Sequence, residues 1–202
     1  MPLDGMLTPP DRQQREARHG HRGVAILLTG LPAAGKSTLA HALDARLFAL
    51  GGQCLVLDGD RLRAGLNRDL GFSENEREEN LRRAAEIAAL LVDAGVVVAM
   101  AMIAPLARHR QLLAERLGAD YREVWCRAAL HNCERRDPKG HYALARAGKL
   151  VSFTGVSAPY EPPQAPALIL DCDTRSAADN LERLLQWMDA EELLGSLTRN
   201  TR

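Results

Sequence analysis

The sequence carries no net charge, because its 26 lysines and arginines balance its 26 aspartates and glutamates. No overall electrostatic field therefore attracts the chain to a polyanion or to a membrane surface. The longest apolar run, from Ala94 to Pro105, is far too short to span a bilayer. The N-terminal segment is polar and contains no apolar stretch of the kind that a secretory signal peptide needs. These absences predict a cytoplasmic protein that binds neither nucleic acid nor membranes.

The sequence also has no Cys-x-x-Cys pair, because its four cysteines, Cys54, Cys126, Cys133 and Cys172, stand far apart. This spacing argues against a zinc site or a dithiol redox motif. At least three of the four lie in or beside apolar runs, as reduced cysteines of a protein core do. The cysteine pattern is therefore typical of a reducing compartment.

The length of 202 residues indicates one domain with short extensions. We expect a flexible N-terminal arm over residues 1–22, because Pro9-Pro10 and the polar run that follows offer nothing to bury. We expect a single domain over residues 23–190 and a C-terminal tail over residues 191–202.

Short apolar runs alternate with helical patterns along the domain. The runs predict strands over residues 24–28, 54–57, 96–102, 121–126 and 167–170. Helices are predicted over residues 37–50 and 177–188, with two more beginning at Ser73 and Pro105; Ser73 and Glu76 form a capping-box pattern. This alternation is typical of an α/β fold with a parallel sheet flanked by helices. Residues 136–163 break the pattern, and they are polar, basic and long enough to predict a functional lid.

The segment from Gly30 to Ser37 matches the phosphate-binding pattern G-x-x-x-x-G-K-[ST], with an apolar strand before it and a periodic helix after it. Its glycines let backbone N–H groups converge on phosphate oxygens at the start of the helix. Lys36 supplies a positive charge to the terminal phosphates, and the Ser37 hydroxyl can hold Mg²⁺. A guanine-reading Asn-Lys-x-Asp segment is absent, which argues against a GTPase switch. The motif predicts a P-loop NTPase-type domain.

Two carboxylates, Asp58 and Asp60, follow the second predicted strand, at the edge where open α/β sheets bind ligands. Either one could hold Mg²⁺ or accept a proton from an attacking hydroxyl. Arg63 and Arg68 add planar donors suited to phosphate or sulfate oxygens. An Asp-Gly-Asp segment is also common in plain turns, so the motif alone leaves both interpretations open.

Seven sequence blocks in order make the chain recognisable. They lie at residues 29–31 with 35–38, at 57–60, 65–73, 77–83, 136–140 and 145–148, and at 153–156 with 158–161. On these blocks the chain resembles adenylylsulfate kinase from about His21 to Met188. The resemblance implies an ATP-dependent phosphotransferase with an alcohol acceptor. It would phosphorylate the 3′-hydroxyl of adenosine 5′-phosphosulfate (adenylylsulfate, APS) to give PAPS, 3′-phosphoadenosine 5′-phosphosulfate, in sulfate assimilation.

The resemblance also assigns roles to single residues, with ATP as co-substrate, Mg²⁺ as cofactor and adenylylsulfate as small-molecule partner. It implies catalytic roles for Lys36, Asp60 and Lys139, and a metal site formed by Ser37 and Asp60. It implies ATP binding by Gly30, Leu31, Pro32, Ala33, Ala34, Gly35, Lys36, Ser37, Thr38 and Arg136. It implies acceptor binding by Arg63, Phe72, Arg77, Asn80 and Phe153, with the two phenylalanines stacking on the adenine. The sequence does not determine the oligomeric state, for which a homodimer is one candidate.

The chain departs from the family pattern at several positions. Pro32-Ala33 stands where many members carry Ser-Gly, and we expect Ala33 to be tolerated only with a negative φ. Ala104 stands where the family often has serine, which excludes a phosphoserine there, and residues 102–106 lack the usual aromatics. Asp60-Arg61 replaces a common Asp-Asn.

Two alternatives remain beside the kinase hypothesis. A kinase of the same fold that acts on a different nucleotide-like acceptor would fit the changes over residues 102–106. A nucleotide-binding scaffold without turnover is disfavoured, because Lys36, Ser37 and Asp60 are all retained.

Overall fold

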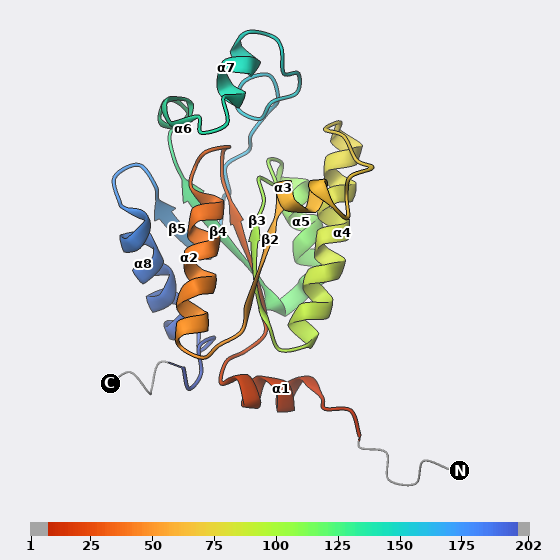
Figure 1. Ribbon diagram of the computed structural model, residues 1–202, viewed down its shortest axis with the longest axis vertical. Helices are drawn as coiled ribbons and strands as arrows, with labels where there is room; N and C mark the ends of the chain where they lie inside the picture. Colours follow the sequence, from red (N-terminus) through yellow and green to blue (C-terminus); the bar gives the residue numbers. More distant parts are fainter. Residues whose placement is uncertain (1–7, 198–202) are drawn as a thin grey trace, which may run out of the picture.

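The computed structural model describes residues 8–197 and arranges them around a parallel five-stranded sheet (Figure 1). The strands are β1 (Val24–Thr29), β2 (Cys54–Asp58), β3 (Val97–Ala101), β4 (Tyr121–Arg127) and β5 (Leu168–Asp171), in the order β2-β3-β1-β4-β5. Every neighbouring pair runs parallel. The predicted α/β class is confirmed, and each predicted strand matches an observed one to within one residue at either end.

Helices cover both faces of the sheet (Figure 1). Helices α2 (Lys36–Ala49) and α8 (Ala177–Ala190) pack on one face, and α4 (Glu74–Asp93) and α5 (Ala107–Leu117) pack on the other. Two separate apolar clusters result, one for each face. The central strand β1 is buried at every position, because both of its faces are covered, and this burial explains its unbroken apolar sequence.

The long helices start in two different ways. Helix α4 begins with the predicted capping box, in which the Ser73 N–H donates to Glu76 at 3.0 Å and Ser73 Oγ accepts from the Glu76 N–H at 3.4 Å. By contrast, α2 follows Gly35 and has no side-chain cap, so the N–H groups of its first turn are left for a ligand. Helix α5 starts at Ala107, slightly later than the predicted start at Pro105.

The prediction of a flexible arm over residues 1–22 is wrong for its described part. Arg12–His19 form helix α1, capped by Asp11, at the end of the molecule opposite α7 (Figure 1). The Arg12 guanidinium forms an ion pair with Asp120 at 2.6 Å and donates to the Gly23 carbonyl at 2.9 Å. An ion pair this remote in sequence is invisible to local pattern reasoning. Residues 1–7 lie outside the described residues.

The predicted C-terminal tail is also packed where it is described. After α8 the chain turns back, and Leu193, Leu194 and Leu197 are buried in the cluster beneath α2 and α8. Residues 198–202 lie outside the described residues. The expected boundary at residue 190 therefore does not mark the end of the packed structure.

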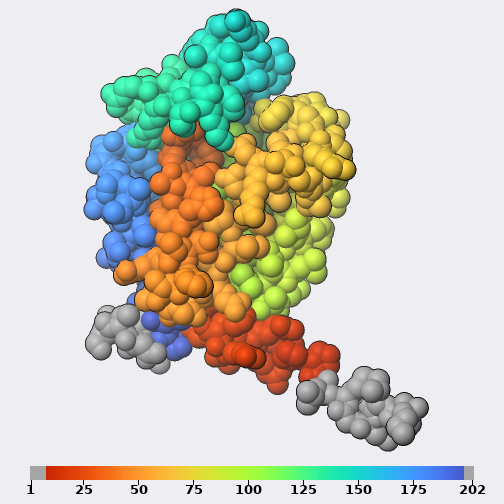
Figure 2. Space-filling model, in the orientation of Figure 1, coloured from red at the N-terminus to blue at the C-terminus, as the bar shows by residue number. Residues whose placement is uncertain are grey.

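Short helices that the sequence analysis did not predict surround the carboxyl edge of the sheet. They are α3 (Gly59–Ala64), α6 (Leu130–Arg136) and α7 (His141–Arg146), and the 3-10 turn η1 (Gly118–Asp120) lies at the other edge. Helix α7 and the chain that follows it rise above the end of α2 (Figures 1 and 2). This is the segment, residues 136–163, that the sequence analysis expected to be a lid. None of the helices over residues 8–197 is long and apolar enough to cross a membrane.

Candidate active site

A cavity of about 970 Å³ opens at the carboxyl edge of the sheet, between α2, the start of α4 and the lid segment. Almost all of the predicted site residues line it, including the P-loop from Pro32 onward, the acceptor set and both lid cations. Two residues predicted to bind ATP, Gly30 and Leu31, do not line the cavity, and their carbonyls accept hydrogen bonds from the Lys36 ammonium. The volume suits a pair of nucleotides rather than one small ion.

The P-loop joins β1 to α2. Gly30 has a φ of 153°, and a side chain at this position would lie 2.5 Å from the Cys126 carbonyl oxygen, so only glycine fits. Lys36 is buried, and its ammonium donates to the Gly30 carbonyl at 3.0 Å and the Leu31 carbonyl at 2.7 Å. Burial lowers the pKa of Lys36. The ammonium is thus held by carbonyls of its own loop, which a phosphate would have to replace.

Ala33 contradicts an expectation from the sequence. Its φ is 61°, in the left-handed region, whereas we expected alanine to be tolerated only with a negative φ. Neighbouring contacts support the strained loop, because Tyr142 Oη donates to the Pro32 carbonyl at 3.0 Å and Arg136 approaches the Ala33 carbonyl at 3.5 Å. Tyr142 was not among the predicted site residues, and no local sequence signal distinguishes it from a core tyrosine.

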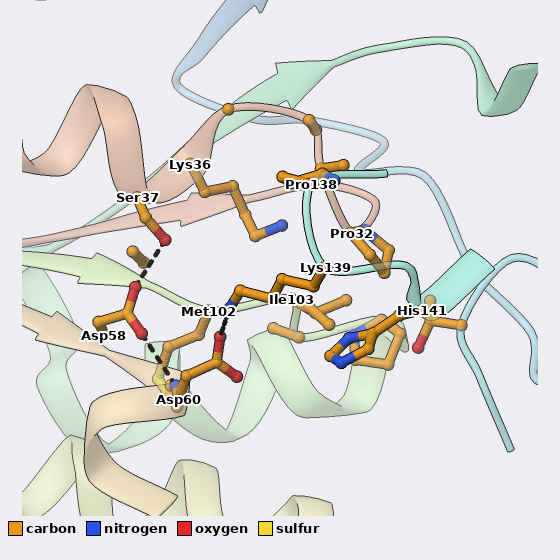
Figure 3. Close-up of a pocket in the computed structure, with 18 of the residues that line it drawn as sticks. Pro32, Lys36, Ser37, Asp58, Asp60, Met102, Ile103, Pro138, Lys139 and His141 are labelled. Atoms are coloured by element: carbon orange, nitrogen blue, oxygen red, sulfur yellow. Dashed lines mark hydrogen bonds and ion pairs between the residues drawn. The ribbon is translucent and has the colours of Figure 1, made fainter. Parts of the chain in front are cut away.

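The two carboxylates after β2 have separate partners (Figure 3). Asp58 accepts a hydrogen bond from Ser37 Oγ at 2.6 Å and caps α3 by accepting from the Asp60 N–H at 2.9 Å. Burial alone would raise the pKa of Asp58, but the Ser37 hydroxyl and the α3 N–H groups outweigh it and lower the pKa. Asp60 lies two residues further on and pairs with Lys139 from the lid segment.

This arrangement separates the residues predicted to form the metal site. Asp58, rather than the Asp60 that the resemblance implied, contacts the Ser37 hydroxyl; the residues alone had left both carboxylates open. Asp58 is the last residue of β2, and only β3 separates β2 from β1, which leads into the P-loop. The donor set of one hydroxyl and one or two carboxylates fits Mg²⁺, which proteins usually bind with substrate phosphates and waters completing its shell. No cluster of three or more histidine, cysteine or acidic side chains that could hold a metal occurs in the part of the chain that the structure describes.

The opposite wall of the cavity is formed by side chains from α3, α4 and the lid segment. The Phe72 ring is 55% exposed and lies beneath two guanidiniums, with Arg63 Cζ at 4.5 Å and Arg77 Cζ at 5.6 Å from its centroid. Both arginines are anchored by backbone carbonyls, Arg63 by Gly71 at 2.5 Å and Arg77 by Ser152 at 2.6 Å. An exposed aromatic face beside two fixed cations can hold a base and an anion together.

Phe153 and Asn80 complete this wall. The Phe153 and Tyr142 rings pack perpendicular to one another, with centroids 4.9 Å apart, so an ordinary packing partner of Phe153 comes from α7. Asn80 is buried, and its Oδ1 accepts from Asn67 Nδ2 at 3.0 Å. Asn67 is completely buried and was not predicted as a site residue, although it lies in one of the recognised sequence blocks.

Residues 102–105 form the floor of the cavity between its two ends. Thr29 Oγ1 donates to the Ile103 carbonyl at 2.5 Å, and Arg110 Nη1 donates to the Ala104 carbonyl at 3.1 Å. Ala104 has a φ of 42°. The segment that departs from the family pattern is thus held through its carbonyls by polar side chains from β1 and α5.

Comparisons with known proteins agree with this geometry. The family model of adenylylsulphate kinase matches residues 22–171. An adenylyl-sulfate kinase from Pseudomonas entomophila is 46% identical over 184 residues, which cover 91% of this chain and 88% of the relative. The structure of the Mycobacterium tuberculosis APS kinase in complex with AMPPNP and APS is 44% identical, with a TM-score of 0.80 over 84% of this chain and 99% of that one. A hexameric APS kinase from Thiobacillus denitrificans is 29% identical, with a TM-score of 0.64 over 93% of this chain and 31% of that one.

Proposed function

The chain belongs to the adenylylsulphate kinase family, and from that premise we propose that it transfers the terminal phosphoryl group of ATP to the 3′-hydroxyl of adenylylsulfate, giving PAPS. The structure of the relative from M. tuberculosis was solved with AMPPNP, an ATP analogue, and APS together. It aligns with 84% of this chain. The observation that carries the proposal for this chain is the single cavity with a P-loop at one end and an aromatic–guanidinium wall at the other.

In this proposal the P-loop end holds ATP. Backbone N–H groups at the start of α2 would bind its phosphates, because that helix has no side-chain cap. Lys36 would exchange its two carbonyl partners for the β- and γ-phosphates, gaining a charged partner for a buried ammonium. Arg136, whose guanidinium already approaches the loop, would cover the nucleotide from the lid side.

The other end would hold adenylylsulfate. Phe72 offers one face to an adenine, and base–aromatic stacking contributes about 1–3 kcal/mol per base. Arg63 and Arg77 would bind the phosphosulfate, while Asn80 and Phe153 would contact the nucleoside from either side. Stacking by Phe153 requires one of its ring faces to turn toward the base, and the perpendicular Tyr142 ring would support it from α7.

Between the two ends, Asp60 would orient the 3′-hydroxyl and accept its proton. Ser37 and Asp58 would hold Mg²⁺ together with ATP, and the ion would supply charge neutralisation on the phosphates. The contact between Lys139 and Asp60 places a lid cation beside the proposed base. Lys139 would leave Asp60 as the substrates enter and would then stabilise the phosphoryl group in transfer.

A steady-state assay of ADP release with a series of acceptors tests this function. We expect adenylylsulfate to give a kcat/KM roughly 10- to 100-fold higher than adenosine 5′-monophosphate, because the latter lacks the sulfate that the two arginines would bind. A higher kcat/KM with another nucleotide would support the alternative of a different acceptor, which the changes at Ala104 and Leu106 keep open. ATP turnover that no acceptor stimulates would contradict both.

The oligomeric state and the cytoplasmic location of the protein remain predictions. A homodimer is one candidate assembly, and the hexameric relative makes self-association worth measuring by light scattering.

A further inference from the structure

Two cysteines, Cys126 and Cys172, lie on or directly after neighbouring strands near the P-loop end of the cavity, which we call the nucleotide end. Cys126 lies on β4 and is completely buried, while Cys172 directly follows β5, is half-buried and lines the cavity. The neighbouring strands place them diagonally, because Cys126 pairs in register with Leu170, two residues before Cys172, and the Cys172 N–H donates to the Arg127 carbonyl at 2.8 Å. Cys172 packs against the apolar cluster that contains Cys126, and its thiol donates to the Leu170 carbonyl at 3.6 Å. This pair is formed by the sheet, so the wide sequence spacing of the cysteines concealed it.

The backbone of the pair contacts both the P-loop and the lid segment. On one side, the Cys126 carbonyl lies directly beneath Gly30 of the P-loop, where no side chain would fit. On the other side, the Cys172 carbonyl accepts a hydrogen bond from Arg136 Nη2 at 2.5 Å. Asn180 also donates to the Cys172 sulfur at 3.8 Å and to the Asp171 carbonyl at 2.9 Å.

We propose that Cys126 and Cys172 form a peroxide-sensitive thiol pair whose disulfide weakens ATP binding. The Cys172 thiolate attacks hydrogen peroxide, forming a sulfenic acid and releasing water after one proton is taken up. The Cys126 thiol then attacks the sulfenic sulfur, and the disulfide forms with release of a second water molecule. Overall, two thiols are oxidised by two electrons while one peroxide is reduced to two waters.

The surroundings of each thiol indicate which one attacks peroxide and which one resolves the sulfenic acid. The neighbouring Cys126 thiol lowers the pKa of Cys172, and Arg136 acts in the same direction against the effect of burial. The neighbouring Cys172 thiol and complete burial raise the pKa of Cys126. Cys172 is also the one that borders the cavity, which gives peroxide a route to it. Cys172 is therefore the attacking thiol and Cys126 the resolving one.

Disulfide formation must draw the two sulfur atoms to about 2.05 Å. That movement shifts Cys172 relative to Arg136 and pulls on the strand that supports Gly30. In the opposite wall, called the acceptor wall below, Arg63 and Arg77 lie on α3 and α4, across the sheet. We therefore expect oxidation to raise the KM for ATP by roughly 2- to 10-fold, the range associated with one lost hydrogen bond, and to leave the KM for adenylylsulfate nearly unchanged. The kinetic part of this expectation rests on the proposed function.

The test treats the full-length protein with hydrogen peroxide and digests it without reduction. Mass spectrometry should find a linked Cys126–Cys172 peptide that dithiothreitol removes. Binding of a fluorescent ATP analogue, measured in parallel, should weaken on oxidation and recover on reduction. Neither measurement needs turnover of adenylylsulfate, so a failure of the acceptor assignment would not affect them.

Cys172→Ser and Cys126→Ser should each lose the oxidation-dependent change in nucleotide binding relative to their own reduced forms. Cys54→Ser, which alters a cysteine on β2 outside the cavity lining, should keep it. The absence of the linked peptide in oxidised wild-type protein would overturn the proposal. So would an unchanged oxidation response in Cys172→Ser, because the attacking thiol would then lie elsewhere.

Discussion

The two ends of the cavity are built from different parts of the chain. The nucleotide end is one continuous unit, β1 followed by the P-loop and α2, and it offers a ligand the uncapped backbone N–H groups at the start of α2. The acceptor wall is formed by side chains from α3, α4 and the lid segment, and Phe72 at its centre is more than half exposed. The comparison indicates that the first end depends on local backbone geometry, whereas the second depends on how distant segments pack together.

If the nucleotide end binds ATP as proposed, Lys36→Ala should cause the largest loss of kcat. Removing the charge from the terminal phosphates should reduce kcat by about 10²- to 10³-fold, the cost of deleting one preorganised electrostatic donor. Steady-state kinetics at saturating adenylylsulfate would measure the loss. Lys149→Ala, which removes an exposed lysine outside the cavity lining, is the matched control and should keep full activity. Near-normal kcat in the Lys36 variant would contradict the P-loop role.

The carboxylates between the two ends should separate into two roles. Asp60→Asn should lower kcat by roughly 10²-fold or more, as losses of a general base do, while ATP binding is kept. Asp58→Asn should instead raise the Mg²⁺ concentration needed for half-maximal activity by roughly 10-fold or more. Asparagine still caps helices well, so α3 should survive the second change. Magnesium titrations of both variants decide the matter, and the reverse pattern would exchange the two assignments.

The acceptor wall should respond more weakly and only to its own substrate. Loss of one stacking face in Phe72→Ala or Phe153→Ala corresponds to about a 5- to 150-fold fall in kcat/KM for adenylylsulfate. The KM for ATP should change little. Phe48→Ala is the matched control, because this third phenylalanine is 80% exposed on α2, away from the cavity. Equal losses for both substrates would mean that the two ends are not independent.

The smallest effect concerns the backbone of the nucleotide end. Ala33→Gly should relieve the cost of the positive φ and stabilise the fold by about 0.5–1 kcal/mol after the entropy of the added glycine is subtracted. Ala114→Gly inside α5 is the control of opposite sign and should destabilise by a similar amount. Urea unfolding midpoints measure both. A destabilised Ala33 variant would show that the loop is not strained at this residue.

The difference between local backbone geometry and long-range packing also explains which features the sequence could predict. Strands, long helices and the P-loop follow from periodicity and local motifs, so their positions agree with the structure closely. The choice between Asp58 and Asp60 could not be made, because it depends on α3 starting at Gly59, where the sequence is equally typical of a turn. Helix α1 could not be predicted because its anchor, the ion pair between Arg12 and Asp120, joins segments far apart in the chain.

The central claim is direct transfer from ATP to the 3′-hydroxyl of adenylylsulfate, with Ala104 standing where a serine could otherwise carry a phosphoryl group. A single-turnover reaction with γ-labelled ATP, Mg²⁺ and adenylylsulfate tests it most directly. All of the transferred label should appear in a nucleotide product from which a 3′-nucleotidase releases it, and none should remain on the protein. Label held by the protein and discharged by the acceptor, or label at any other position of the product, would contradict the account.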